Sequence, residues 1–292
     1  MLRSMYSGIS GMKNFQTKLD VIGNNIANVN TYGFKKGRTT FKDMVSQQIA
    51  GATAPGDIRG GVNPRQVGLG SQLASIDTVG TQGSLQTTGR TLDLGISGDG
   101  YFRLGETTAA PDEDTDDLAV DETTFVYTRA GNFYLDKNGY IVNADGLYLT
   151  NVDGNAIKIP TDAQSFSVGA NGTVNYIPGT SDPDAEPDPD AEEEENVIEA
   201  GTIALIKFAN PEGLTKFGGN LYKESSNSGS PSEENPGEGG TGEIVAGTLE
   251  MSNVDLSEEF TEMIVAQRGF QANTKIITTS DEILQELVNL KR

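Results

Sequence analysis

Hydrophobic residues near the start of the chain recur every three or four positions, which is the period of an amphipathic helix. Gly33, which follows Thr31 and Tyr32, is expected to end this helix. Asn24, Asn25 and Asn28 lie on or beside the side of the helix turned away from the apolar stripe. The stripe consists of Met5, Ile9, Met12, Phe15, Leu19, Ile22, Ile26 and Val29.

A second amphipathic helix is predicted at the other end of the chain. Asp255, with Glu258 three residues later, resembles a capping box in which Asp replaces the usual Ser or Thr. Apolar residues then follow a heptad register, although three intervening positions of that register, 267, 274 and 281, are polar. The heptad residues are Leu256, Phe260, Met263, Phe270, Ile277, Leu284 and Val288, and Ile276, Ile283, Leu287 and Leu290 widen the apolar face.

Between the two helices the hydrophobic period changes to two, which indicates short β-strands. Alternation is clear at Leu92, Leu94 and Ile96, and again around residues 125–127, 157–159 and 174–176. Glycine-containing turn sequences separate these runs, namely GDG at 98–100, DKNG at 136–139, ADG at 144–146 and ANG at 170–172. The pattern predicts an all-β region of short hairpins.

Three other stretches lack either period. Residues 51–70 are rich in Gly and Pro and are expected to form an irregular, extended arm. Residues 178–199 hold many carboxylates and several prolines without a basic residue, which is typical of disorder. Residues 224–242 form a second loop rich in Gly, Ser, Pro and Glu, after a strand-like run at 202–208.

The fold class predicted is α+β, with the N- and C-terminal helices paired as a coiled coil and a central all-β domain with acidic loop insertions. Residues 1–34 with 252–292 would form the helical inner domain, and 35–83 an extended connecting arm. Residues 84–177 with 200–251 would form the β-rich outer domain, and 178–199 a disordered acidic insert.

Composition excludes several classes of function. The chain contains 21 Lys and Arg against 42 Asp and Glu, a net charge of -21, so neither nucleic acid nor an anionic membrane is an expected partner. It has no Cys, no His and no Trp, which excludes Cys/His zinc sites, Ser-His-Asp triads and thiol nucleophiles. No apolar run is long enough to cross a membrane, and the charged first twenty residues do not predict a cleaved signal peptide.

Other chemistry has weak support in the sequence. The acidic run at 182–199 lacks the spacing of a calcium loop, and no glycine-rich phosphate loop surrounds the basic cluster of Lys35, Lys36, Arg38 and Lys42. No pair of carboxylates stands out as a glycosidase dyad. We therefore expect no catalytic residue, no cofactor, no metal and no enzymatic activity.

A pair of amphipathic helices leaves apolar surface uncovered, because a two-stranded coiled coil buries one stripe per helix. In one interpretation the pair packs on the chain's own β domain. In the other it packs against copies of the same chain, with Asn24, Asn25 and Asn28 hydrogen-bonded to neighbours and the basic cluster 35–42 in salt bridges with their acidic surfaces. A head-to-tail contact that does not close produces a helical filament. A soluble adhesin or carbohydrate-binding β module with helical stalks is the competing class, and it would remain a small oligomer.

Four stretches, in order along the chain, resemble bacterial flagellar rod and hook proteins. They are SGISGMKNFQTKLDVIGNNIANVNTYGFKK at 7–36, TLDLGISGDGYFRL at 91–104, YTRAGNFYLDKNGYIVNADGLYL at 127–149 and LEMSNVDLSEEFTEMIVAQRGFQANTKIITTSDEILQELVNLKR at 249–292. The resemblance implies a non-enzymatic axial subunit that leaves the cell by the flagellar type III export apparatus without a cleaved signal. It also implies polymerisation beneath a cap into a tube, with the terminal helices inside and the β domains outside.

Within this family, the segments at 20–28, 263–273 and 287–290 favour the hook, a universal joint between rod and filament. The alternative is the distal rod of the basal body, whose subunits resemble this layout and carry an extra segment, linked to stiffness, where residues 51–70 lie. The partners implied by the resemblance are the chain itself, rod and hook–filament junction proteins, the hook cap and the export apparatus. The implied location is the flagellar basal body or the extracellular hook.

Overall fold

The computed structural model of this protein describes residues 2–56, 59–107, 118–121, 124–179 and 197–290. The chain divides into two compact units, and both are discontinuous in sequence. Unit 1 comprises residues 1–29, 36–79 and 254–292, and unit 2 comprises residues 30–35 and 80–253. Residues 36–79, expected as part of a separate connecting arm, therefore group with the terminal helices.

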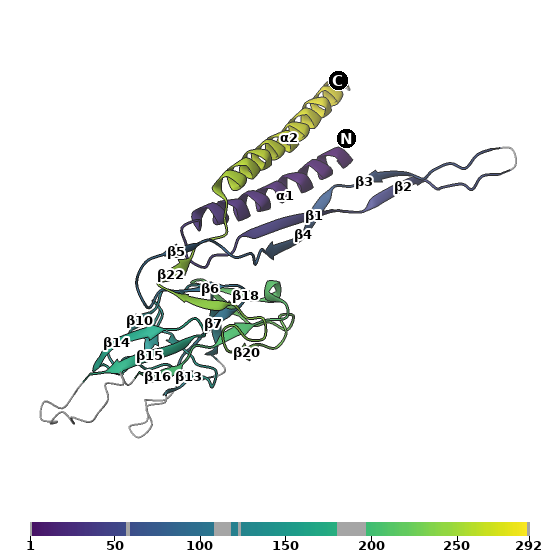
Figure 1. Ribbon diagram of the computed structural model, residues 1–292. Coiled ribbons are helices and arrows are strands. Elements are labelled where there is room, and N and C mark those ends of the chain that lie inside the picture. Colours follow the sequence, from purple (N-terminus) through teal and green to yellow (C-terminus); the bar gives the residue numbers. More distant parts are fainter. Residues whose placement is uncertain (1, 57–58, 108–117, 122–123, 180–196, 291–292) are drawn as a thin grey trace, which may run out of the picture. The chain divides into compact units, whose positions relative to one another are not determined.

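Unit 1 contains both helices and a long β-hairpin arm (Figure 1). Helix α1 spans Leu2–Ala27 and helix α2 spans Leu256–Asn289. Strand β1 (Gly37–Asp43) pairs antiparallel with β4 (Ser71–Thr78), and β2 (Ser46–Ala50) pairs antiparallel with β3 (Arg65–Gly68). The predicted N-terminal helix, C-terminal helix and central β region are thus confirmed.

The arm at 51–70 is more regular than predicted. A bridge between Thr53 and Val62 extends the β2–β3 pairing toward its tip, with backbone hydrogen bonds of 3.0 Å in both directions. The periodicity of two was missed because every residue of β2 and β3 is exposed, so neither strand has an apolar face that alternates with a polar one.

Helix ends follow partly from the sequence. The Asp255 side chain caps α2 by accepting hydrogen bonds from the backbone N–H groups of Ser257 and Glu258. The reciprocal half of the predicted capping box is not seen, because the Glu258 carboxylate instead pairs with Lys36 Nζ at 2.9 Å. At the other helix, the predicted end at Gly33 is wrong, because α1 ends at Ala27; Gly33 has a φ of +67° but lies six residues beyond the helix.

Unit 2 is a set of small antiparallel sheets. The largest has nine strands among the described residues. Seven of them follow one another in the order β10 (Tyr134–Leu135), β11 (Ile141–Val142), β12 (Tyr148–Leu149), β7 (Tyr101–Gly105), β9 (Val126–Thr128), β19 (Leu221–Lys223) and β18 (Thr215–Gly218). The other two lie off this order: β17 (Leu205–Lys207) pairs with β7 and with β20 (Ser232–Glu234). A three-stranded sheet contains β14 (Ala163–Val168), β15 (Thr173–Pro178) and β16 (Ile198–Thr202).

Three two-stranded pairs complete unit 2. They are β5 (Leu85–Thr87) with β22 (Thr248–Glu250), β6 (Leu94–Ser97) with β21 (Glu243–Ala246), and β8 (Leu118–Ala119) with β13 (Asn155–Ala156). A short 3-10 helix spans Pro211–Gly213. The loop predicted at 224–242 therefore includes a short strand, and the strand-like run at 202–208 is divided between β16 and β17.

The predicted hydrophobic alternation marks the core of unit 2. Leu94 and Ile96 are fully buried with Leu104, Phe133 and other residues of one large cluster, and two smaller clusters flank it. The four predicted turns are also present, since the glycines at 100, 139, 146 and 172 all have a φ between +81° and +137°. Most of the acidic segment 178–199, predicted to be disordered, lies outside the described residues.

Candidate functional site

The interface between α1 and α2 is the first feature of unit 1 that bears on function. The helices are antiparallel: an added Cβ on Gly8 would lie 3.4 Å from Ile277 Cγ1, and Asn25 Nδ2 donates a hydrogen bond of 3.1 Å to Glu259 Oε2. Residues near the start of one helix thus meet residues near the end of the other, as in any antiparallel pair of helices. The arrangement is consistent with the predicted coiled-coil pairing.

The side chains that α2 buries alternate in steps of four and three. Four predicted interface residues, Met263, Phe270, Ile277 and Leu284, lie on this face, but Leu256, Phe260 and Val288 are 39%, 49% and 67% exposed. The second row is therefore shifted by one position from the prediction. The buried and half-buried face consists of Glu259, Met263, Ala266, Gly269, Phe270, Asn273, Ile277, Ser280 and Leu284.

Glycines explain the shift, because they allow the helices to approach closely. A Cβ on Gly269 would lie 2.5 Å from the Phe15 ring, and a Cβ on Gly11 would lie 2.8 Å from Asn273 Nδ2. Such contacts are shorter than van der Waals distance, so larger residues would force the helices apart. A register chosen for its hydrophobicity overlooks small residues such as Ala266 at these positions.

We predict that Gly269→Ala separates the two helices and lowers stability. A methyl group clashes with the Phe15 ring, and overpacking of this kind costs about 1–3 kcal/mol, which exceeds the roughly 1 kcal/mol that Ala gains over Gly in a helix. Gly23→Ala is the matched control, because no atom lies within 4 Å of its Cβ position. Thermal unfolding followed by helical circular dichroism should show a lower midpoint for the first variant and a higher one for the second.

Helix α1 is covered on two sides. Ile22 is buried, Ile9 is exposed, and Met5, Met12, Phe15, Leu19, Ile26 and Val29 are half-buried. Besides α2, the helix contacts the arm, where Asn14 Nδ2 donates a hydrogen bond of 2.8 Å to Ser71 Oγ. This second contact explains why its predicted stripe does not coincide with one interface.

The asparagines near the end of α1 have different environments. Asn25 is buried rather than turned outward: it contacts Glu259 and exchanges two hydrogen bonds of 2.9 Å with the backbone of Gly37. It therefore connects α1, α2 and β1 within one chain, contrary to the expectation that it faces a neighbouring subunit. Asn24 is exposed, and Asn28 is half-buried and donates to the Asn24 backbone carbonyl. Only these two remain candidates for contacts between subunits.

The partner of Asn25 carries a perturbed carboxyl group. Burial raises the pKa of Glu259, the Asn25 hydrogen bond and the nearby Lys36 oppose the shift, and the neighbouring Glu262 and Glu258 add to it. A raised pKa means that the folded state retains a proton that the unfolded state releases, so this group makes folding more favourable as the pH falls through the raised pKa toward 4.5, its ordinary value.

We predict that Glu259→Gln raises the thermal stability of unit 1 at neutral pH, because a neutral amide can accept the Asn25 hydrogen bond without burying a charge. The gain over the unmodified chain should shrink in mildly acidic buffer, where Glu259 becomes protonated. Glu262→Gln serves as the control, since Glu262 is 47% exposed and pairs with Lys18 at 3.0 Å. A gain at neutral pH from the control, or a gain from the first variant that is independent of pH, contradicts the prediction.

The basic cluster is largely paired within the chain. Lys35 is buried with Glu250, Lys36 pairs with Glu258, and the Arg38 guanidinium lies 3.6 Å from Asp77. Lys42 is exposed and has no ion pair within the described residues. Lys35 is buried, so it cannot form the expected salt bridge to a neighbouring subunit. Arg38 and Lys42, which are exposed, remain candidates for such salt bridges.

Unit 1 has very little interior of its own. Among its described residues only Gly8, Ile22, Asn25, Glu259, Ala266 and Ser280 are buried. Large apolar side chains instead face solvent. Those on α2 are Leu256, Phe260, Ile264, Val265, Ile276, Ile283, Leu287 and Val288, with Tyr6 and Ile9 on α1 and Phe41, Met44, Val45, Ile49, Val62, Val67, Leu73 and Ile76 on the arm.

This exposed apolar surface is the candidate functional site. Its outer α2 residues, including Ile264 and Val265, were not identified from the sequence as a separate surface, because they were not assigned to the predicted heptad. Over the described residues the structure offers little else: no group of three or more Asp and Glu side chains is placed to hold a metal ion. Neither α1 nor α2 has a stretch hydrophobic enough to span a bilayer.

Comparison with known proteins identifies the family of the chain. Three family models match in order: "Flagella basal body rod protein" at residues 5–35, "Flagellar hook protein FlgE/F/G D1 domain" at 95–176 and "Flagellar basal body rod FlgEFG protein C-terminal" at 245–290. The first and last cover α1 and α2, and the middle one covers the core of unit 2.

Relatives match over the full length. The chain is 60% identical over 293 residues to the flagellar basal-body rod protein FlgG of Bacillus subtilis, with 100% of both chains covered. It is 36% identical over 297 residues to FlgG of Borreliella burgdorferi and 33% identical over 456 residues to the flagellar hook protein FlgE of the same organism, again with both chains fully covered. The chain therefore belongs to the bacterial flagellar hook and basal-body rod family.

Proposed function

We propose that this chain is a distal rod subunit of the flagellar basal body, which polymerises with copies of itself into a stiff tube. The hook, which the segments at 20–28, 263–273 and 287–290 favour, has weaker support. A full-length relative named as a rod protein is 60% identical, whereas the hook relatives are 33% and 31% identical. Alignment to those hook proteins extends over 456 and 478 positions, so they carry long insertions that this chain of 292 residues lacks.

The proposal of self-assembly rests on the large apolar side chains that unit 1 leaves exposed. A unit with two helices and a hairpin arm should bury a continuous apolar interior, yet this one exposes most of its large apolar side chains. Unit 2 has its own well-buried core, so the exposed surface does not reflect a generally apolar protein. Neighbouring copies that cover α2 and the arm would gain roughly 25 cal/mol for each Å² of apolar area buried.

The same geometry favours a filament over a closed oligomer. Exposed apolar residues lie on α2, on α1 and along the arm, so different surfaces of unit 1 are available to different neighbours. Contacts between unlike surfaces are heterologous, and they propagate into a helical assembly when the rotation does not close. The net charge of -21 would keep single subunits soluble before assembly. The subunit is a structural component, and other axial proteins of the rod and hook are its expected neighbours.

The β arm supports the rod over the universal joint. Pairing of β2 with β3 and of β1 with β4 makes residues 37–50 and 65–78 a long ribbon with apolar side chains exposed on it. A ribbon that packs between neighbouring subunits adds contacts that a bending tube would have to break on each rotation. In the distal rod proteins that the sequence resembles, the extra segment at this place is linked to stiffness.

A deletion strain tests the assignment. Basal bodies purified from a strain that lacks this chain should show an incomplete rod and no hook when imaged by electron microscopy. Complete rods without hooks would instead identify the chain as the hook subunit. Normal basal bodies with intact hooks would remove the chain from the axial structure altogether.

A further inference from the structure

The chain passes between unit 1 and unit 2 four times, at residues 29/30, 35/36, 79/80 and 253/254. On the unit 2 side, these passages are continued by three segments, residues 30–35, 80–83 and 250–253. Any load that reaches unit 2 along the backbone enters through these segments. Their attachment to the remainder of unit 2 is therefore of mechanical interest.

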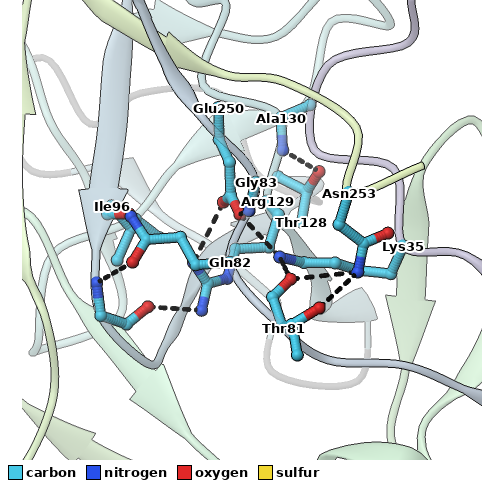
Figure 2. Close-up of polar contacts among 11 residues, drawn as sticks. Lys35, Thr81, Gln82, Gly83, Ile96, Thr128, Arg129, Ala130, Glu250 and Asn253 are labelled. Carbon is cyan, nitrogen blue, oxygen red and sulfur yellow. Dashed lines mark hydrogen bonds and ion pairs between the residues drawn. The ribbon is translucent and has the colours of Figure 1, made fainter. Parts of the chain in front are cut away.

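One buried carboxylate joins all three segments. The Glu250 side chain is fully buried, and its Oε1 accepts hydrogen bonds from Lys35 Nζ at 2.6 Å and from the Gly83 N–H at 2.9 Å (Figure 2). Its Oε2 accepts from an Arg129 guanidinium N–H at 3.0 Å. Arg129 directly follows β9, so the carboxylate is connected to the nine-stranded sheet.

Thr81 is a second meeting point for the same segments. Its backbone carbonyl accepts hydrogen bonds from Lys35 Nζ at 3.0 Å and from Asn253 Nδ2 at 3.1 Å, and its hydroxyl oxygen lies 3.1 Å from the same Asn253 nitrogen. Backbone contacts add to this, because the Gly33 N–H donates to the Glu250 carbonyl at 2.8 Å. The three segments are thus fixed to one another as well as to the sheet.

Lys35 leaves this buried cluster with one more cation than anion. Arg129 and Glu250 already form a buried pair of opposite charge, and Arg129 also donates to the Gly98 carbonyl at 2.8 Å. Lys35 adds a second buried cation, and burial lowers its pKa although Glu250 opposes the shift. Burying an extra charge is unfavourable. What Lys35 contributes is geometric, since its ammonium is the only group of the cluster that contacts both Glu250 and Thr81.

We propose that Lys35, Glu250 and Arg129 form a crossing clamp, which holds the three segments where the chain enters and leaves unit 2 and limits the motion of one unit against the other. Lys35 is a positioning residue in this clamp. In an axial subunit of the kind proposed above, the clamp makes the subunit rigid and so contributes to the stiffness of the polymer. The clamp itself is a property of the single chain, and it is tested without a polymer.

Hydrogen exchange of the purified Lys35→Met chain provides the first test. The Arg129–Glu250 pair remains balanced in this variant, so unit 2 should stay folded. Amide exchange in residues 30–35, 80–83 and 250–253 should rise about tenfold or more, as expected on losing hydrogen bonds from a buried charge, whereas exchange in β7 and β9 should not change. Equal exchange in Lys35→Met and the unmodified chain, or a uniform rise throughout unit 2, overturns the proposal.

Arg103→Met is the matched control. Arg103 is another buried cation of unit 2, but its partners, Thr150, Asn151 and Glu233, lie outside the three segments. Its removal should raise exchange around residues 150–152 and leave the three segments protected. Selective loss of protection in 30–35 after this substitution would show that any buried cation has the same effect, and the clamp would be refuted.

Distance measurements test the effect on the two units. Since the chain has no cysteine, two introduced cysteines at the exposed positions Gln271 in unit 1 and Lys137 in unit 2 carry unique spin labels. The distribution of distances between the labels should be broader in Lys35→Met than in Arg103→Met or the unmodified chain. Distance distributions of equal width in all three proteins overturn the clamp and leave the proposal of self-assembly intact. Failure of the unmodified chain to polymerise would instead overturn the proposed function and leave the clamp intact.

Discussion

Replacing both Ile264 and Val265 with aspartate should abolish polymer formation and leave the monomer folded. Both side chains are 58% exposed on α2, and neither faces α1, so their loss removes little from the single chain. In a polymer each would be buried, a contribution of about 1.5–3 kcal/mol per residue, and an aspartate at the same place would be a buried unpaired charge. The critical concentration for assembly should rise by at least ~100-fold, since 1.4 kcal/mol corresponds to tenfold.

Sedimentation of assembled protein over a range of concentrations measures this effect, with circular dichroism as the check that the helices persist. Replacing both Gln267 and Gln271 with aspartate is the control, because it adds the same two charges to α2 at exposed positions that are already polar. Polymers from the double variant at the normal critical concentration would show that this face of α2 is not an assembly surface. Loss of the helical signal would instead show that these residues support the monomer.

Replacing Gly131 with alanine should prevent unit 2 from folding. Gly131 lies against the backbone of Leu94, so that an added Cβ would be 1.7 Å from the Leu94 carbonyl oxygen, while the Leu94 N–H donates a hydrogen bond of 2.9 Å to the Gly131 carbonyl. The Leu94 atoms nearest to this Cβ position are all backbone atoms, which cannot move aside as a flexible side chain could. The two backbone segments must therefore separate, and the fully buried core around Leu94 must open. We expect a loss of more than about 3 kcal/mol.

Gly146→Ala distinguishes this effect from the general loss of a glycine. Gly146 has a φ of +85°, and no atom lies within 4 Å of its Cβ position. Only the strain of a left-handed conformation applies there, about 1–2 kcal/mol. Chemical denaturation followed by tyrosine fluorescence should show an unfolded unit 2 for Gly131→Ala and a folded but weakened one for Gly146→Ala. A stable, cooperative transition in the first variant would contradict the close approach.

The sequence predicts elements best where a local period is strong. The apolar stripe of the first thirty residues predicted α1, the alternation at Leu92, Leu94 and Ile96 predicted buried strands, and the glycine turns predicted where the hairpins reverse. Each signal arises within a few residues, because helices and strands place neighbouring side chains at fixed angles. The four resembling segments likewise identified the family before any contact was known.

The sequence alone did not show which face of each helix is covered. The row of Glu259, Ala266, Asn273 and Ser280 carries no large apolar side chain, yet it is the one that α1 covers, and Gly269 on the same face permits close packing. Asn25 and Lys35, both expected to face neighbouring subunits, are instead buried within the chain by Glu259 and Glu250. These partners are more than 200 residues distant in sequence, which no local pattern records.

By itself, therefore, the sequence determined the two helices, the β region between them, the absence of Cys and His chemistry and the membership of an axial family. Only the tertiary structure decided the register of the helix pair, the regular pairing of the arm, the meeting of Lys35, Arg129 and Glu250, and the apolar surface that unit 1 leaves uncovered. The reason is physical: hydrophobic periodicity states that a face will be buried, whereas the identity of what buries it depends on residues brought together from distant parts of the chain.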